Sequence, residues 1–197
     1  MNAQLLTEEI IDSPKFLTLY GVNWDKFKAI EFALDGISNV QLVYLDGIID
    51  IMAPLSAEHE DAKSVIRQLI VIYLEEKGIR FYARGSRTLG SKELGIQKEP
   101  DESFNLHTKK EIPDLVLEVV VTSGGINTLD IYKRIKVPEV WFWRKGNLSI
   151  YSLQEEEYKA VAKSELLPDL NLDLLVRCAN IEDQYDALIE FRKALRQ

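Results

Sequence analysis

Cysteine and histidine are scarce in this sequence, and their scarcity excludes two ways of stabilising a small fold. The chain includes one cysteine, Cys178, and two histidines among its 197 residues. A single cysteine cannot form a disulfide within the chain and is typical of a reducing compartment, so we expect a cytoplasmic protein. One cysteine and two histidines are too few for a Cys/His zinc cluster. The core must therefore fold by burying apolar side chains, for which this length is sufficient.

The chain also lacks long apolar runs and an excess of basic residues. No apolar segment approaches the about 20 residues of a transmembrane helix, and residues 1–9 lack the basic-then-apolar pattern of a signal peptide. We therefore predict no contact with a membrane. Lysine and arginine number 24 against 32 aspartates and glutamates, which gives a net charge of −8. This balance argues against an extended nucleic-acid-coating surface, but it permits a local basic groove.

The length and the lack of repeats or linkers indicate one domain over residues 1–197. Within it we expect an N-terminal leader over residues 1–21, a core over residues 22–177 and a C-terminal helix over residues 178–197. The order of helical and strand-like segments in the core is typical of an α/β fold with a central mixed sheet flanked by helices.

Three segments support this α/β fold. The Asp46-Gly47 dipeptide stands between two apolar segments, which is typical of a β-hairpin with a type I′ turn. Apolar residues repeat at helical spacing over residues 57–77, with Ser56 in the N-cap position. Residues 112–121 are rich in β-branched residues and leucine, which predicts a strand buried on both faces at the centre of a sheet.

Two carboxylates stand out because of their surroundings. Glu118 lies in the most apolar strand, where an ionised carboxylate is costly unless it faces a metal, a partner or a cleft. Asp101 lies 17 residues upstream, in a segment that can form the neighbouring strand. Two acids on adjacent strands can hold Mg²⁺, which activates water and stabilises the charge of a phosphodiester transition state. The pattern alone leaves open that Asp101 is a turn residue and that Glu118 faces solvent at a strand end.

Several motifs occur in an order that resembles the Uma family of restriction endonucleases, in the PD-(D/E)XK nuclease superfamily. The similar segments are MAP at residues 52–54, His59-Glu60, EPD at residues 99–101, PDLVLEVV at residues 113–120 and VPEVWFW at residues 137–143. The resemblance implies a restriction-endonuclease-like core. It also implies that Asp101 is the aspartate of the PD element and Glu118 the acid of the (D/E)XK element, and that both bind Mg²⁺ or Mn²⁺.

The same resemblance implies a catalytic lysine that is missing from its expected positions. The superfamily has this lysine two residues after the acid, where the chain has Val120. The family has it on the following helix, four residues before a tyrosine that matches Tyr132, and this position is Thr128. Threonine cannot supply the positive charge that stabilises the transition state. The basic residue of the site is therefore missing or comes from elsewhere.

Five further side chains are candidates for the site. Lys63, Arg84 and Arg87 are candidates to replace the missing lysine. His59 opens the long helix, where the residues alone leave open a histidine exposed to solvent; the family often has a histidine there, and the resemblance favours a catalytic role for it. Asp50 lies between apolar neighbours in the second strand of the hairpin. It is a candidate third metal ligand, although the solvent face of a strand explains it equally well.

The sequence thus predicts a Mg²⁺-dependent endonuclease that hydrolyses phosphodiester bonds in DNA. By analogy with similar nucleases we expect a homodimer, because two cleavage sites on duplex DNA match a two-fold axis. One alternative is a catalytically inactive nuclease fold that binds nucleic acid or a partner protein, and Thr128 favours it. A second alternative is an interaction module that uses exposed tryptophan and tyrosine side chains. We expect Trp141 and Trp143, however, to be buried in a strand or in a dimer contact.

Overall fold

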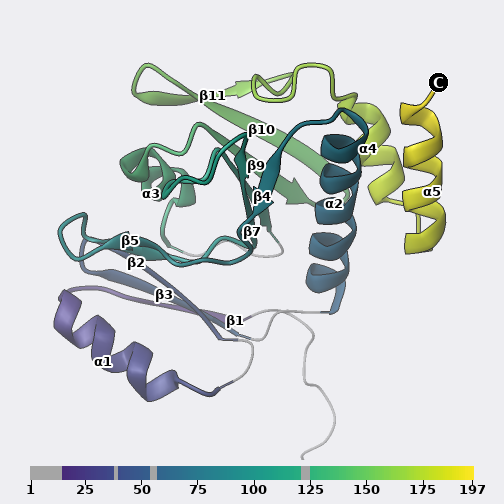
Figure 1. Cartoon of the computed structure of the whole chain (residues 1–197). Helices are drawn as coiled ribbons and strands as arrows, with labels where there is room; N and C mark the ends of the chain where they lie inside the picture. The colour runs from purple at the N-terminus through teal and green to yellow at the C-terminus, as the bar shows by residue number, and fades with distance from the viewer. Residues whose placement is uncertain (1–14, 38–39, 54–56, 121–124) are drawn as a thin grey trace, which may run out of the picture.

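The computed structural model describes residues 15–37, 40–53, 57–120 and 125–197, which form two sheets and five helices (Figure 1). Residues 1–14 of the predicted leader and the predicted N-cap Ser56 lie outside these ranges. No helix within them is long and apolar enough to cross a membrane. All the candidate site residues named above are among the described residues.

A six-stranded sheet forms the centre of the protein, in the strand order β11-β10-β9-β8-β7-β4. The bounds are β4 Phe81–Ala83, β7 Glu102–Leu106, β8 Leu115–Val119, β9 Glu139–Arg144, β10 Asn147–Gln154 and β11 Glu157–Val161. β8 and β9 are parallel and the other neighbours are antiparallel, so the sheet is mixed. Every residue of β8 is buried between β7 and β9, which confirms the predicted central strand. Trp141 and Trp143 of β9 are also buried.

Helices cover both faces of this sheet. α2 (Ala57–Glu76), α4 (Leu172–Ala179) and α5 (Gln184–Leu195) pack on one face, and α3 (Thr128–Ile135) lies on the other (Figure 1). Alternation along β8 divides its side chains, so that Leu117 packs with α2 and Val116 packs with α3. The predicted mixed sheet flanked by helices is confirmed.

The C-terminal helix that the sequence predicts over residues 178–197 is shorter and forms α5, while residues 178 and 179 end a separate helix, α4. α4 ends at Ala179, and Asn180 follows as its C-cap. α5 begins after Asp183, whose side chain accepts a hydrogen bond from the backbone N–H of Asp186. The break arises because Asp183 caps a new helix, as aspartate favours at this position.

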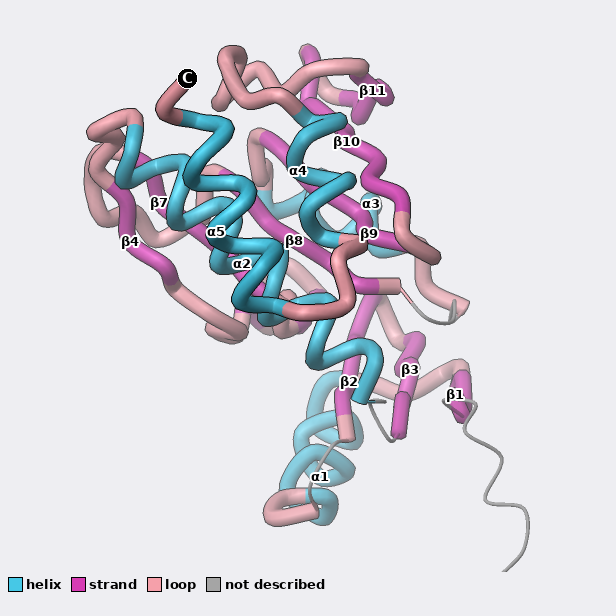
Figure 2. Tube along the Cα trace, turned by 90° about the vertical axis from the view of Figure 1, so that its right-hand side faces the viewer, coloured by secondary structure: helices cyan, strands magenta, loops and turns pink. Residues whose placement is uncertain are grey.

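A second sheet of five antiparallel strands lies beside the first, in the order β1-β3-β2-β6-β5 (Figure 2). The bounds are β1 Lys15–Leu19, β2 Gln41–Leu45, β3 Ile48–Ala53, β5 Leu89–Ser91 and β6 Ile96–Lys98. Asp46 and Gly47 have φ values of 44° and 89°, as a type I′ turn requires, which confirms the predicted hairpin. Residues 15–19, part of the predicted leader, belong to this sheet because they pair with β3.

Helix α1 (Trp24–Leu34) covers this second sheet. Its Phe27 is fully buried and stacks on Tyr44 of β2 with ring centroids 4.7 Å apart. Burial of such an aromatic side chain contributes about 1.5–3 kcal/mol, which anchors the helix to the strands. The second sheet therefore has a core of its own and can hold β6 in place against the central sheet.

Candidate active site

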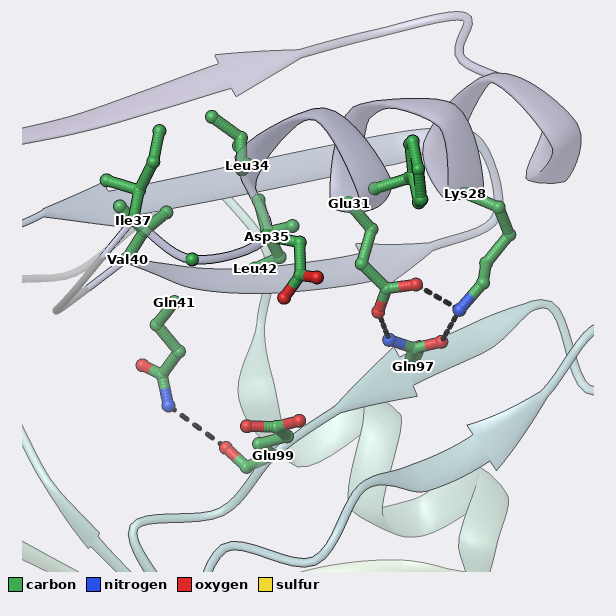
Figure 3. Close-up of a pocket in the computed structure, with 12 residues that line it drawn as sticks. Lys28, Glu31, Leu34, Asp35, Ile37, Val40, Gln41, Leu42, Gln97 and Glu99 are labelled. Carbon is green, nitrogen blue, oxygen red and sulfur yellow. Dashed lines mark hydrogen bonds and ion pairs between the residues drawn. The ribbon is translucent and has the colours of Figure 1, made fainter.

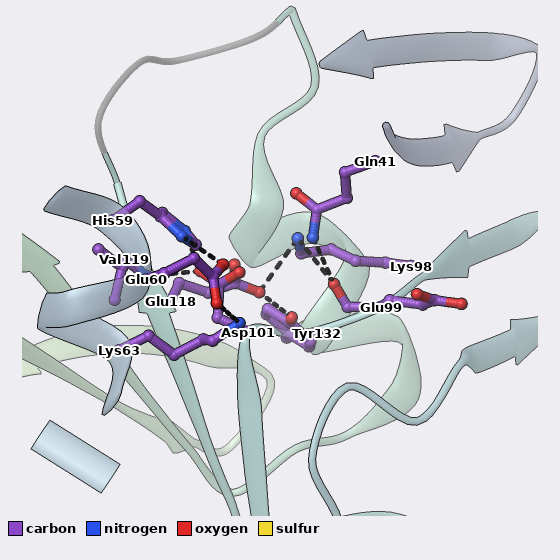
Figure 4. A network of polar contacts seen from close by, with 10 residues as sticks. All are labelled: Gln41, His59, Glu60, Lys63, Lys98, Glu99, Asp101, Glu118, Val119 and Tyr132. Atoms are coloured by element: carbon purple, nitrogen blue, oxygen red, sulfur yellow. Dashed lines mark hydrogen bonds and ion pairs between the residues drawn. The ribbon is translucent and has the colours of Figure 1, made fainter. Parts of the chain in front are cut away.

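Five buried polar side chains meet where the two sheets join (Figure 4). They are Lys98 at the end of β6, Asp101 between β6 and β7, Glu118 on β8, His59 in the first turn of α2 and Tyr132 on α3. Residues 99–101 carry the chain from the second sheet to the central sheet, so one short segment brings both Lys98 and Asp101 to the junction. Buried ionisable groups gathered in this way are typical of a functional site.

Asp101 is held next to β8 by a backbone hydrogen bond. β7 begins at the following residue and pairs antiparallel with β8, as the sequence predicts. The backbone N–H of Val119 donates to Oδ2 of Asp101 at 2.7 Å, and Nε2 of His59 lies 3.2 Å from the same oxygen. Burial alone would raise the pKa of Asp101, but the contact with His59 and the charge of Lys98 outweigh it and lower the pKa. Asp101 is therefore ionised at neutral pH.

Glu118 faces the same junction from the central strand. Its Oε1 accepts a hydrogen bond from the hydroxyl of Tyr132 and lies 3.1 Å from Nζ of Lys98. Burial, together with the negative charge of Asp101, raises the pKa of Glu118 to about 7, although Lys98 and Tyr132 oppose the shift. Glu118 is only 6% exposed, so the alternative in which it faces solvent at a strand end is wrong.

His59 brings the first turn of α2 into the site. Besides Asp101, it contacts Glu60, whose Oε1 lies 3.2 Å from Nδ1 of the ring. Burial would lower the pKa of His59, but the hydrogen bonds and charges of these two carboxylates outweigh burial and raise it. His59 thus tends to carry a positive charge beside Asp101.

Comparison with known proteins identifies the family of this chain. A family model described as "Putative restriction endonuclease" matches residues 24–180. The chain belongs to the Uma2 family. A crystal structure from Anabaena variabilis ATCC 29413, described as "a putative nuclease belonging to DUF820", is 13% identical, with a TM-score of 0.45. The match covers 76% of this chain and 90% of the other. No curated protein gives a significant match.

The predicted Uma2 lysine position carries no charge here. Thr128 is the first residue of α3, where the side chain of Asn127 caps the helix. It lies four residues before Tyr132, so the two residues share a face of α3. Because Tyr132 contacts Glu118, α3 approaches the acid beside which the resemblance predicts a lysine.

Lys98 is the site residue that sequence reasoning missed. It lies 20 residues before Glu118, on a strand of the other sheet, whereas the two positions at which the resemblance predicts a lysine, 120 and 128, both follow the acid. Its side chain is only 2% exposed, which is rare for lysine unless it is paired. Its position three residues before Asp101, next to the EPD motif, is the signal that could have found it.

The three other basic candidates have different surroundings. Lys63 forms an ion pair with Glu60, with 2.6 Å between Nζ and Oε2. Neither Arg84 nor Arg87 contacts Asp101 or Glu118 among the described residues. Among the lysines and arginines of the described residues, Lys98 is thus the one that contacts Glu118, while His59 contacts Asp101.

Asp50 lies in a separate set of contacts on β3. Its Oδ1 accepts from the hydroxyl of Thr18 at 2.6 Å, and its Oδ2 accepts from the backbone N–H of Ile126 at 2.8 Å. Both oxygens are thus engaged in joining β1, β3 and the segment before α3. Its predicted role as a third metal ligand has no support from these contacts.

The acidic pair fits a divalent cation that needs few protein ligands. The described residues contain no group of three or more His, Cys, Asp or Glu side chains able to hold a metal. Mg²⁺, however, is commonly held by one or two carboxylates and keeps several waters. Asp101 and Glu118 each direct their described hydrogen bonds to one oxygen, which leaves Oδ1 and Oε2 without one in the described part of the chain. A cation would also offset the burial and the charge of Asp101, which together raise the pKa of Glu118.

A pocket adjoins the site on the side of α1 and β2 (Figure 3). The amide of Gln41 donates to the backbone oxygen of Glu99 at 3.0 Å, at the border between the pocket and the site. Its lining includes three acids, Glu31, Asp35 and Glu99, and one lysine, Lys28. This excess of negative charge makes the pocket unsuitable for a phosphodiester backbone.

Proposed function

We propose that this Uma2 chain is a Mg²⁺- or Mn²⁺-dependent endonuclease that hydrolyses phosphodiester bonds in DNA. The observation that carries the proposal is the meeting of two buried carboxylates, Asp101 in the bend before β7 and Glu118 on the neighbouring strand β8. Burial of two acids is costly unless a cation or a hydrogen-bonding partner offsets it. The family to which the chain belongs supplies the reaction class.

The residues around Asp101 and Glu118 have two different roles, holding the cation and orienting the two carboxylates. Asp101 and Glu118 would hold the cation, which supplies an activated water and neutralises charge on the phosphate. The backbone N–H of Val119 and the ring of His59 fix the carboxylate of Asp101, and Tyr132 fixes that of Glu118. Such fixed partners orient the ligands before substrate binds, so little reorganisation is needed during the reaction.

The acidic surface limits how the protein contacts DNA. With a net charge of −8, contacts to phosphates must be confined to a local groove at the site. We expect a homodimer, in which two copies cut the two strands about a two-fold axis. We also expect the protein to work in the cytoplasm, where the buried thiol of Cys178 stays reduced.

Cleavage of supercoiled plasmid in Mg²⁺ or Mn²⁺ tests the proposal. The wild type should nick or linearise the plasmid, and both Asp101→Asn and Glu118→Gln should abolish cleavage. Glu156→Gln is the matched control, because Glu156 is exposed in the turn between β10 and β11. Cleavage by Glu118→Gln at the wild-type rate would overturn the proposal, and so would a folded wild type that cuts in neither metal.

The threonine at position 128 favours a second candidate function. A nuclease fold without the family's lysine can bind nucleic acid or a partner protein without cutting it. Binding of a labelled DNA duplex by a wild type that never cleaves it would support this alternative. Cleavage that Asp101→Asn abolishes would exclude it.

A further inference from the structure

The ammonium group of Lys98 lies among the acids of the site. Its Nζ is 3.1 Å from Oε1 of Glu118 and 3.5 Å from the backbone oxygen of Glu99. Gln41 donates to that same backbone oxygen, so β2 supports the segment from which Lys98 extends (Figure 4). An ammonium has three hydrogens to donate. Within the described part of the chain these contacts use two of them, which leaves one for a water or a phosphate oxygen.

A purely structural role explains Lys98 poorly. Burying a lysine and a glutamate together costs desolvation that their attraction often fails to repay, and an apolar pair is frequently more stable. Glu118 also has a second partner in Tyr132, which donates to the same oxygen. A buried positive charge at this place therefore calls for a function that an apolar residue could not perform.

Lys98 contacts Glu118, the same carboxylate that α3 contacts through Tyr132. Thr128 and Tyr132 share a face of α3, and Tyr132 contacts Oε1 of Glu118. Lys98 contacts the same oxygen, but from β6 on the other sheet. A lysine at either position would thus approach Glu118 from a different element.

We propose that Lys98 replaces the lysine missing at position 128 and supplies the positive charge of the active site. This inference rests on the proposed nuclease function. Hydrolysis adds the oxygen of water to phosphorus, breaks the bond from phosphorus to the leaving oxygen and transfers one water proton to that oxygen. Lys98 keeps its own protons throughout. It donates hydrogen bonds to Glu118 and to the attacking water or the phosphate, where it stabilises the negative charge that develops.

Two variants of Lys98 and one relocation test this role. Lys98→Met should lower the rate of plasmid cleavage by about a hundredfold, the typical effect of removing one charge-stabilising donor. Lys98→Arg keeps the charge and should retain more activity than Lys98→Met. The double variant Lys98→Met with Thr128→Lys should regain activity over Lys98→Met, because it returns a lysine to Glu118 from α3. Lys92→Met is the matched control, since Lys92 is exposed and pairs with Asp25.

Two further measurements separate this role from a structural one. Binding of a short fluorescein-labelled duplex in Ca²⁺ should weaken far less in Lys98→Met than the rate of cleavage falls, because Lys98 acts mainly on the charge that develops during the reaction. Thermal unfolding shows whether each variant is folded. Wild-type cleavage by Lys98→Met would overturn the inference. Failure of the relocated lysine to restore any activity in a folded double variant would also overturn it.

The outcome for Thr128→Lys alone distinguishes the two proposals. If the wild type is inactive but Thr128→Lys cleaves, the nuclease scaffold is sound, and Lys98 does not replace the missing lysine. If neither protein cleaves in Mg²⁺ or Mn²⁺, the nuclease function fails and the role of Lys98 fails with it. If the wild type cleaves and Lys98→Met does not, both proposals are supported.

Discussion

Tyr132 donates its hydroxyl hydrogen to Glu118, joining α3 to the central strand of the sheet inside the protein. The residues are 14 positions apart, and both are buried. Burial, together with the charge of Glu118, raises the pKa of Tyr132 well above its usual value, so its hydroxyl remains a donor at any working pH. This contact fixes the direction in which the carboxylate of Glu118 points and leaves its other oxygen for a ligand.

Removing this hydroxyl should weaken both stability and activity. Above pH 7, where Glu118 is ionised, Tyr132→Phe deletes a hydrogen bond to a charged group, which is worth about 1.5–3 kcal/mol, and should lower the melting temperature by several degrees. It should also slow cleavage, because Glu118 is held less firmly. Differential scanning fluorimetry beside Tyr20→Phe, at an exposed tyrosine, measures the first effect. Equal melting temperatures for the two variants would contradict the expectation.

The stability of the metal-free protein should fall as the pH rises through neutrality. The pKa of Glu118 is raised from 4.5 to about 7 by burial, so the folded protein keeps a proton that the unfolded chain loses. The stabilisation is complete below pH 4.5 and is lost as the pH rises through about 7, with a total of roughly 3 kcal/mol. Urea unfolding in a chelator at several pH values measures the change.

Glu118→Gln serves as the reference in that experiment, because glutamine has a similar shape and does not titrate. The pKa of His59 is also raised, so part of the loss above pH 6.5 belongs to that residue and should persist in the variant. Only the difference between wild type and Glu118→Gln reports on Glu118. A difference that stays constant between pH 4.5 and about 7 would show that the carboxyl titrates as an ordinary glutamate.

Mg²⁺ should stabilise the folded protein through the acidic pair. A ligand at a hundred times its dissociation constant adds about 2.7 kcal/mol when it binds only the folded state. The melting temperature should therefore rise with Mg²⁺ concentration in the wild type and stay constant in Asp101→Asn and Glu118→Gln. The same rise in all three proteins would place the ion at another site.

Asp50 should prove to be structural. Asp50→Ala leaves the hydroxyl of Thr18 and the backbone N–H of Ile126 without their acceptor, which should cost about 1–3 kcal/mol for each donor that stays buried. The rise in melting temperature with Mg²⁺ should be preserved in the destabilised variant. Loss of that rise in a folded Asp50→Ala protein would instead support the predicted metal ligand.

Local patterns determined much of the fold. The run of β-branched residues before Val120 specifies a strand buried on both faces, whatever lies around it. Asp46-Gly47 specifies its turn because both residues must adopt positive φ values. The sequence also indicated that Asp101 and Glu118 can come together, although it left open that Asp101 is a turn residue; Asp101 lies in the bend before β7, which pairs with β8.

The tertiary structure alone decided which basic residue joins these acids. Lys98 and Glu118 belong to different sheets, and their contact depends on how the sheets pack at residues 99–101. His59 reaches Asp101 across 42 positions because α2 packs on the central sheet. The sequence therefore determined most of the elements and indicated the two acids, since periodicity, turn geometry and strand pairing act over short separations. Which lysine contacts Glu118 depends on the packing of the two sheets, and a contact between segments so far apart cannot be predicted from a local sequence pattern.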